Sequence, residues 1–171
     1  MRDLLDNGPG LIVFGAQGWY KLTDSVFLDY LSQDIKMTNS SAVWRYLIGY
    51  KNLLRAIENL GIAVVYGIRY YGQGNITEDN YVQFIKHDTI SSEYLNQSRN
   101  FVTYVREEFE RVKAEGYEYD TWRSSRKQVL EGKNRVPDTQ EAYHYYLATY
   151  RYTEDLRYIT QQTTPHQPSS S

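Results

Sequence analysis

Cysteine is absent from the 171-residue chain. This absence excludes a disulfide framework, a thiolate metal site and a cysteine nucleophile. It does not exclude secretion, because a large helical core is stable without cross-links. The length suits one domain with a sizeable core.

A surplus of positive charge is also missing. Lysine and arginine number 19 against 21 aspartate and glutamate residues, and the formal net charge is −2. Proteins that bind nucleic acids in general neutralise phosphate with an excess of Lys and Arg. We therefore expect no nucleic-acid partner, and no basic face for attachment to a membrane surface.

Long apolar runs are absent as well. No segment approaches the roughly 20 consecutive apolar residues of a membrane span. The N-terminal stretch MRDLLDNGPGLIVFGAQGW lacks the basic start and continuous apolar run of a signal peptide. We expect contact with a membrane only through a longer parent chain.

Histidine is scarce, and its three positions do not suggest a metal site. His87, His144 and His166 form no HxxxH or HExxH pair. The GxSxG context of a serine nucleophile does not occur either. The sequence thus predicts neither a metal, nor a cofactor, nor an enzymatic activity for this chain.

Tyrosine, in contrast, is abundant, with 18 residues. A tyrosine covers a large apolar area and keeps one polar tip, which suits half-wet helix seams and interfaces. Two interpretations remain open. The tyrosines line either a homodimer interface or the wall of a ligand cavity.

The apolar spacing from Ser40 onward is helical. Steps of four and three alternate through Val43, Leu47, Tyr50, Leu54, Ile57, Gly61, Val64, Ile68 and Tyr71. This pattern predicts a long amphipathic helix over 40–71, which ends at the glycines that follow. Gly61 and Gly67 lie inside it, so we expect them to serve close helix packing and not a phosphate-binding loop.

Three further helices are expected downstream. The pattern predicts a second long helix over 77–115, with its weakest point near 88–91, then a shorter one over 119–132 and a last one from 142 to 159. The fold class is therefore all-α, an up-down helical bundle with two long helices. We expect an irregular segment at 1–24, the bundle at 25–161 and a disordered tail at 162–171.

Arginines on the first long helix are candidate ligand-binding residues. Arg45, Arg55 and Arg69 each lie within a turn of tyrosines, and a guanidinium beside hydroxyls can hold a small anion through two bonds. The alternative is an exposed residue in a local ion pair, such as Arg55 with Glu58. Three stretches match the glycan acceptor pattern, at Asn39, Asn75 and Asn96.

Two stretches, VWRYLIGYKNLLRAIENLGIAVVYGIRYYGQGNIT and YVQFIKHDTISSEYL, resemble the nitrate- and nitrite-sensing domain family of animal receptor guanylate cyclases. The residues that fit the family pattern are Trp44, Glu58, Gly61, Ile62, Gly67 and Gly74. The resemblance implies a helical sensor bundle on the extracellular side of the plasma membrane. The family carries Glu-Arg-Ala after its Gly-Ile pair, with the Arg in an oxyanion site, and this chain has Ala63, Val64 and Val65 there.

The resulting hypothesis is a sensor or ligand-binding domain, an input for signals and not a catalyst. Because Val64 replaces the family's arginine, we expect nitrate or nitrite to bind no tighter than millimolar. The competing hypothesis is a structural or interaction protein that dimerises through a tyrosine-rich face and has no small-molecule ligand.

Overall fold

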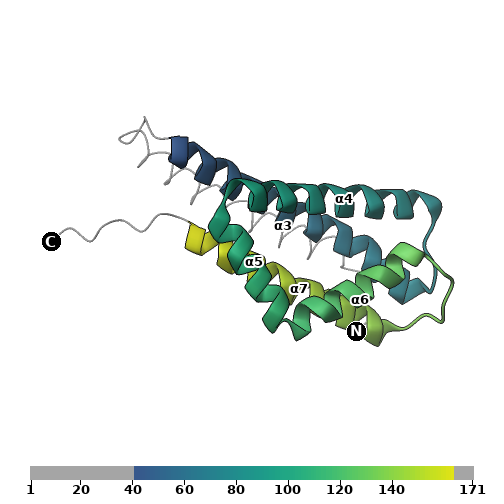
Figure 1. The fold of residues 1–171 in the computed structure, drawn as a ribbon. Coiled ribbons are helices and arrows are strands. Elements are labelled where there is room, and N and C mark those ends of the chain that lie inside the picture. The colour runs from purple at the N-terminus through teal and green to yellow at the C-terminus, as the bar shows by residue number, and fades with distance from the viewer. Residues whose placement is uncertain (1–40, 164–171) are drawn as a thin grey trace.

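The computed structural model describes residues 41–163, and this part of the chain is built from helices without a strand. The helices are α3 (Ser41–Gln73), α4 (Glu78–Phe101), α5 (Thr103–Glu115), α6 (Tyr117–Glu131) and α7 (Thr139–Thr163), labelled as in Figure 1. The all-α prediction is confirmed. The expected irregular segment 1–24, the start of the bundle at 25 and the tail beyond 163 lie outside the described residues.

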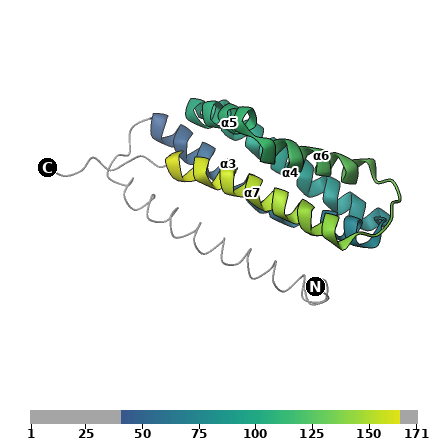
Figure 2. The ribbon, with the colours of Figure 1, turned by 90° about the horizontal axis from the view of Figure 1, so that it is seen from below.

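The helices form four antiparallel columns. α4 packs along α3, α7 packs on α3, and α5 and α6 pack on α7 as two consecutive pieces of one column (Figures 1 and 2). α7 runs opposite to α3 and ends beside the start of α3 (Figure 1). The up-down topology is therefore confirmed, with the third column split into two helices.

The long helix α3 was predicted closely. Gly74 follows its last residue with φ of 76°, the left-handed conformation that favours glycine, and its N–H donates to the Tyr70 carbonyl at 2.9 Å. Thr77 then caps α4, because its hydroxyl accepts from the Asn80 N–H at 3.3 Å.

The second long helix does not continue to residue 115 as predicted. It is broken at Val102, which has extended backbone with φ of −125° and ψ of 112°. The reason lies in the neighbouring helix. Gly49 of α3 has no side chain, and the Val102 side chain occupies the space where a Cβ would stand. The Ser98 hydroxyl donates to the Gly49 carbonyl at 2.7 Å, so the end of α4 lies close against the backbone of α3.

The expected weak point at 88–91 is continuous helix. Ser91 does not disturb the backbone of its own helix, because its hydroxyl donates at 2.7 Å to the Ala56 carbonyl of α3. Because the Ser91 hydroxyl bonds to another helix, it does not compete with the backbone hydrogen bonds of α4.

The predicted short helix and last helix are both present. Asp138 caps α7 by accepting from the N–H groups of Gln140 at 2.8 Å and Glu141 at 3.1 Å. The last helix runs to Thr163, so residues 162–163 are helical and do not belong to the expected tail.

Two apolar clusters fill the bundle. One cluster joins all the columns through Leu53, Leu60, Val105, Phe109, Trp122, Tyr152, Leu156 and Ile159. The other lies toward the end of α3 and contains Ala63, Val64, Tyr70, Tyr71, Phe84, Val129 and Tyr145.

Tyrosine hydroxyls fasten α6 and the loop that follows it to the end of α3. Tyr70 donates to the Lys133 carbonyl at 2.7 Å, and Tyr71 donates to the Ser125 carbonyl at 2.9 Å. Two backbone bonds join the same segments, from Arg135 N–H to the Gly74 carbonyl at 2.7 Å and from Asp138 N–H to the Tyr71 carbonyl at 2.9 Å.

Candidate functional site

A buried ion pair links α4 to α6. The Arg126 guanidinium donates from Nε to one oxygen of Asp88 and from Nη2 to the other, both at 2.6 Å. The Asp88 side chain is 6% exposed and the Arg126 side chain 27%. Hydrogen bonding to Asp88 raises the pKa of Arg126, against the opposing effect of desolvation. This fork is the geometry with which arginine binds planar oxyanions.

Aromatic rings surround the guanidinium. The Arg126 Cζ lies 5.7 Å from the centre of the Trp122 ring, and Trp122 stacks on Tyr152 at 4.2 Å. Burial raises the pKa of the Tyr152 and Tyr145 hydroxyls far above the ordinary value. The nearby negative charge of Asp88 adds to the shift at Tyr145. The ion pair therefore lies in a partly dry seam, where electrostatic interactions are stronger than in water.

This region also holds hydrogen-bond donors that no acceptor in the described part of the chain satisfies. They are the buried indole N–H of Trp122 and the buried Nε–H of Arg99. Arg99 stacks over Phe109 at 4.6 Å and pairs with Glu110 at 2.9 Å. The Trp122 indole N–H is therefore an unsatisfied donor beside the Arg126 guanidinium, whereas Arg99 belongs to the contact between α4 and α5.

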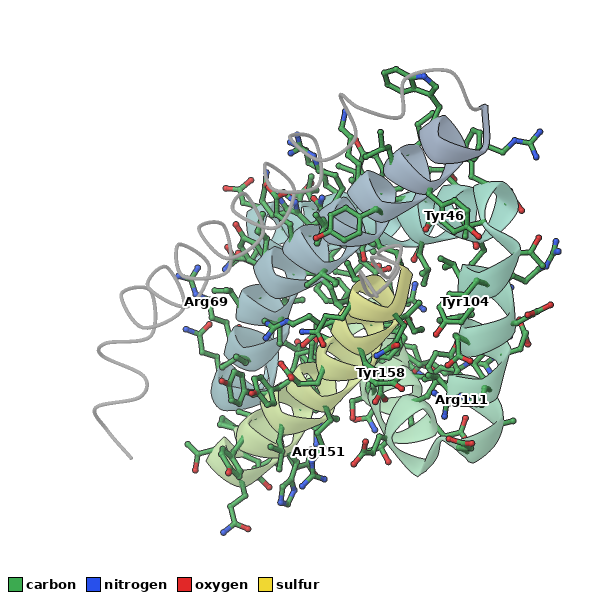
Figure 3. All side chains as sticks on the ribbon, turned by 90° about the vertical axis from the view of Figure 1, so that its left-hand side faces the viewer. Tyr46, Arg69, Tyr104, Arg111, Arg151 and Tyr158 are labelled. Atoms are coloured by element: carbon green, nitrogen blue, oxygen red, sulfur yellow. The ribbon has the colours of Figure 1, made fainter. Side chains whose placement is uncertain are left out.

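The three arginines predicted as ligand-binding residues do not come together. Arg45, Arg55 and Arg69 are exposed on α3, and the last two are about 21 Å apart along the helix. Arg55 is 49% exposed and pairs with Glu58 at 3.4 Å, as the alternative interpretation held. Arg69 points outward from α3, with its Cζ 5.9 Å from the centre of the Tyr66 ring (Figure 3).

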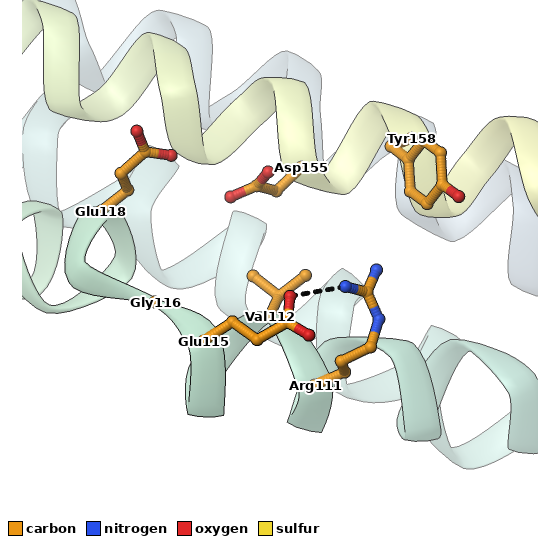
Figure 4. A pocket seen from close by; sticks show the side chains of 7 residues that line it. All are labelled: Arg111, Val112, Glu115, Gly116, Glu118, Asp155 and Tyr158. Atoms are coloured by element: carbon orange, nitrogen blue, oxygen red, sulfur yellow. Dashed lines mark hydrogen bonds and ion pairs between the residues drawn. The ribbon is translucent and has the colours of Figure 1, made fainter.

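An open hollow of about 330 Å³ lies where the corner of α5 and α6 meets α7 (Figure 4). Its charged lining is mainly acidic, with Glu115, Glu118 and Asp155. The one guanidinium in the lining belongs to Arg111, which pairs with Glu115 at 2.6 Å and Glu108 at 2.8 Å. Desolvation and the neighbouring carboxylates raise the pKa of Asp155, so this hollow disfavours an anion.

The family model for nitrate and nitrite sensing matches residues 15–164, which is most of the chain. The chain belongs to the nitrate- and nitrite-sensing family. No curated protein and no solved structure matches it. Membership in a sensing family gives the chain the role of a signal input.

Within this nitrate- and nitrite-sensing domain, Val64, which the sequence resemblance places where the family has an arginine, is a core residue. Val64 is buried in the cluster at the end of α3, where it provides apolar contacts and no hydrogen-bond donor. Gly67 is buried too, and a Cβ at this position would fall on the Tyr145 ring, 2.6 Å from its hydroxyl oxygen. Gly61 is half-buried.

The remaining predicted site residues lie on the surface or outside the described part. Asn75 is exposed in the turn after α3, and Asn96 is exposed on α4, where its side-chain oxygen accepts from Arg99 at 3.4 Å. Asn39 lies outside the described residues. In the described residues, no three acidic or histidine side chains are grouped as metal ligands. No described helix combines the length and apolar content needed to cross a bilayer.

The Asp88–Arg126 pair was not predicted from the sequence, although the position of each residue on its helix indicates that it is at least partly buried. Asp88 precedes Ser91 by three positions, about one helical turn, so it lies on the same buried face of α4. Arg126 lies four positions after Trp122 and three before Val129, on the apolar stripe of α6. A charge on an apolar stripe requires a partner, and two such charges of opposite sign predict each other.

Proposed function

We propose that this chain is the input domain of a longer receptor, of the receptor guanylate cyclase type, and that its ligand is nitrate or nitrite. The family match supports the ligand class and the input role. The glycan acceptor patterns at the exposed Asn75 and Asn96 support a place on the extracellular side of the plasma membrane.

Arg126 is the residue that we propose to bind the anion. Its two-bond fork with Asp88 in the α4–α6 seam is the observation that carries this proposal. Nitrate and nitrite are planar and offer two neighbouring oxygens, as a carboxylate does, so they fit the same edge of the guanidinium. Arg45, Arg55 and Arg69 are exposed, and exposed arginines bind anions weakly because water and salt screen the charge.

The expected affinity is millimolar or weaker. Asp88 is tethered beside Arg126, so a free anion competes with a carboxylate of very high local concentration. Val64 adds no donor in the neighbouring cluster. The domain is thus suited to report millimolar changes in nitrate and not traces of it.

Calorimetric titration with nitrate, nitrite and chloride at constant ionic strength tests this function. We expect saturable millimolar binding of nitrate and nitrite, and weaker binding of chloride, which cannot span two N–H groups. Arg126→Lys keeps the charge but loses the fork, so it should abolish the preference over chloride. Micromolar nitrate binding that is lost in Arg55→Ala or Arg69→Ala would contradict the assignment to Arg126.

The alternative function, a homodimer without a small ligand, is favoured by the outer face of α7. Tyr143 and Tyr150 are 48% and 42% exposed, and their spacing of seven positions puts them on one face. The Tyr146 ring stacks against Tyr150 at 6.4 Å and widens this surface. Exposed rings in a row are typical of protein interfaces.

Sedimentation velocity distinguishes this alternative. If α7 forms the dimer interface, Tyr150→Glu should weaken dimerisation by about 2 kcal/mol or more, the loss typical of a central aromatic contact. Val82→Glu, at a residue 55% exposed on α4, is the matched control and should leave association unchanged. A monomer at all concentrations, for the unmodified chain, would exclude this interface.

A further inference from the structure

The buried carboxylate of Asp88 occupies the edge of Arg126 that a planar oxyanion would take. Both oxygens of Asp88 are engaged, each by a different nitrogen of the guanidinium, and both distances are 2.6 Å. The pair joins two columns, since Asp88 comes from α4 and Arg126 from α6.

The two partners differ in their access to water. Asp88 is almost fully enclosed, whereas about a quarter of the Arg126 side chain reaches solvent, at 27%. An incoming anion therefore meets the guanidinium first and has to displace the carboxylate to reach both donors. Trp122 stacks beside the guanidinium and Tyr145 lies within the field of Asp88, so the displaced state keeps a partly dry environment.

We propose that Asp88 is a resident occupant of the anion site, which sets the threshold for free planar oxyanions by competing with them for Arg126. The inference rests on the proposed function for the identity of the ligand and adds a residue that regulates the same site. It also defines the ligand class. Anions with two neighbouring oxygens, such as nitrate, nitrite and formate, compete with Asp88, whereas chloride, which has a single centre, competes poorly.

Removal of the carboxylate tests the inference directly. In Asp88→Ala the space of the carboxylate is empty and the positive charge of Arg126 has no negative partner there. Exogenous formate should therefore bind in the place of the carboxylate. We expect the affinity for formate and nitrate to increase by about tenfold or more over the unmodified chain, because the competitor is gone. Chloride at equal ionic strength should show no such gain.

Three further variants keep the test decisive. Asp88→Asn, which preserves shape, serves if the alanine variant folds poorly; a smaller gain is expected, because the amide loses the negative charge but still fills the space. The double variant Asp88→Asn with Arg126→Gln should lose the gain. Glu110→Gln removes the acid from a different arginine pair, Arg99–Glu110, and should leave nitrate affinity unchanged.

The two proposals fail in different ways. A gain for formate without one for nitrate upholds the resident carboxylate and contradicts nitrate as the ligand. No gain for either anion in both Asp88 variants overturns the inference, while saturable nitrate binding by the unmodified chain would still support the proposed function. A gain that persists after Arg126→Gln places the anion elsewhere and overturns the inference as well.

Discussion

Replacing Arg126 with methionine is expected to lower the free energy of unfolding by about 3–5 kcal/mol. The change leaves the Asp88 carboxylate, which is 6% exposed, without its two donors in the seam. A buried charge without a partner costs far more than the net value of the pair that it belonged to. Methionine keeps an unbranched apolar stem in place of the arginine methylenes, so lost packing contributes little.

Urea denaturation of matched variants measures this loss. The double variant Arg126→Met with Asp88→Leu removes both charges and should recover most of the stability. Glu110→Gln breaks the ion pairs of an exposed acid with Arg99 and Lys113, and should cost far less stability than Arg126→Met. Equal losses in Arg126→Met and Glu110→Gln would show that the Asp88 pair is hydrated in solution.

Gly67→Leu is expected to destabilise the bundle by about 3 kcal/mol, at the upper end of overpacking effects. Even a Cβ at Gly67 would overlap the ring of Tyr145, which is buried and packs on Tyr71 at 5.4 Å. Leucine is a better helix former than glycine by nearly 1 kcal/mol, but the overlap with a confined ring outweighs that gain.

Thermal and urea unfolding of Gly67→Leu, with and without Tyr145→Ala, check the explanation. If the ring is the obstacle, the two substitutions together should cost less than the sum of the two separate losses. An additive result would place the new side chain in contact with other residues and remove the explanation based on Tyr145.

Local features of the fold were predictable from the sequence because their causes lie within a few residues. The alternation of apolar steps defined α3, and Pro137 with Asp138 marked the start of α7. The break at Val102 was not predictable in this way. It depends on Gly49, which is 53 positions earlier in the chain and leaves the space that the Val102 side chain fills.

The candidate site was beyond single-helix reasoning for a similar reason. The proximity of arginines to tyrosines on one helix predicted an anion site at Arg45, Arg55 and Arg69. All three are exposed in the structure. The fork needs two residues that are 38 positions apart and come from different columns. Their stripes could be read from the sequence, but which stripes face each other is decided by the packing of the whole bundle.

The hydrogen bonds that fasten α6 and the loop that follows it to the end of α3 have a mechanical consequence. At that end, Tyr70, Tyr71, Gly74, Arg135 and Asp138 join the two segments through side chains and backbone together. The opposite end, where α3 begins and α7 finishes, has no loop between these two helices (Figure 1). Directional bonds therefore resist separation of α3 from the α6–α7 segment at this end, whereas the far part of α7 is held by the apolar contacts of Leu156 and Ile159.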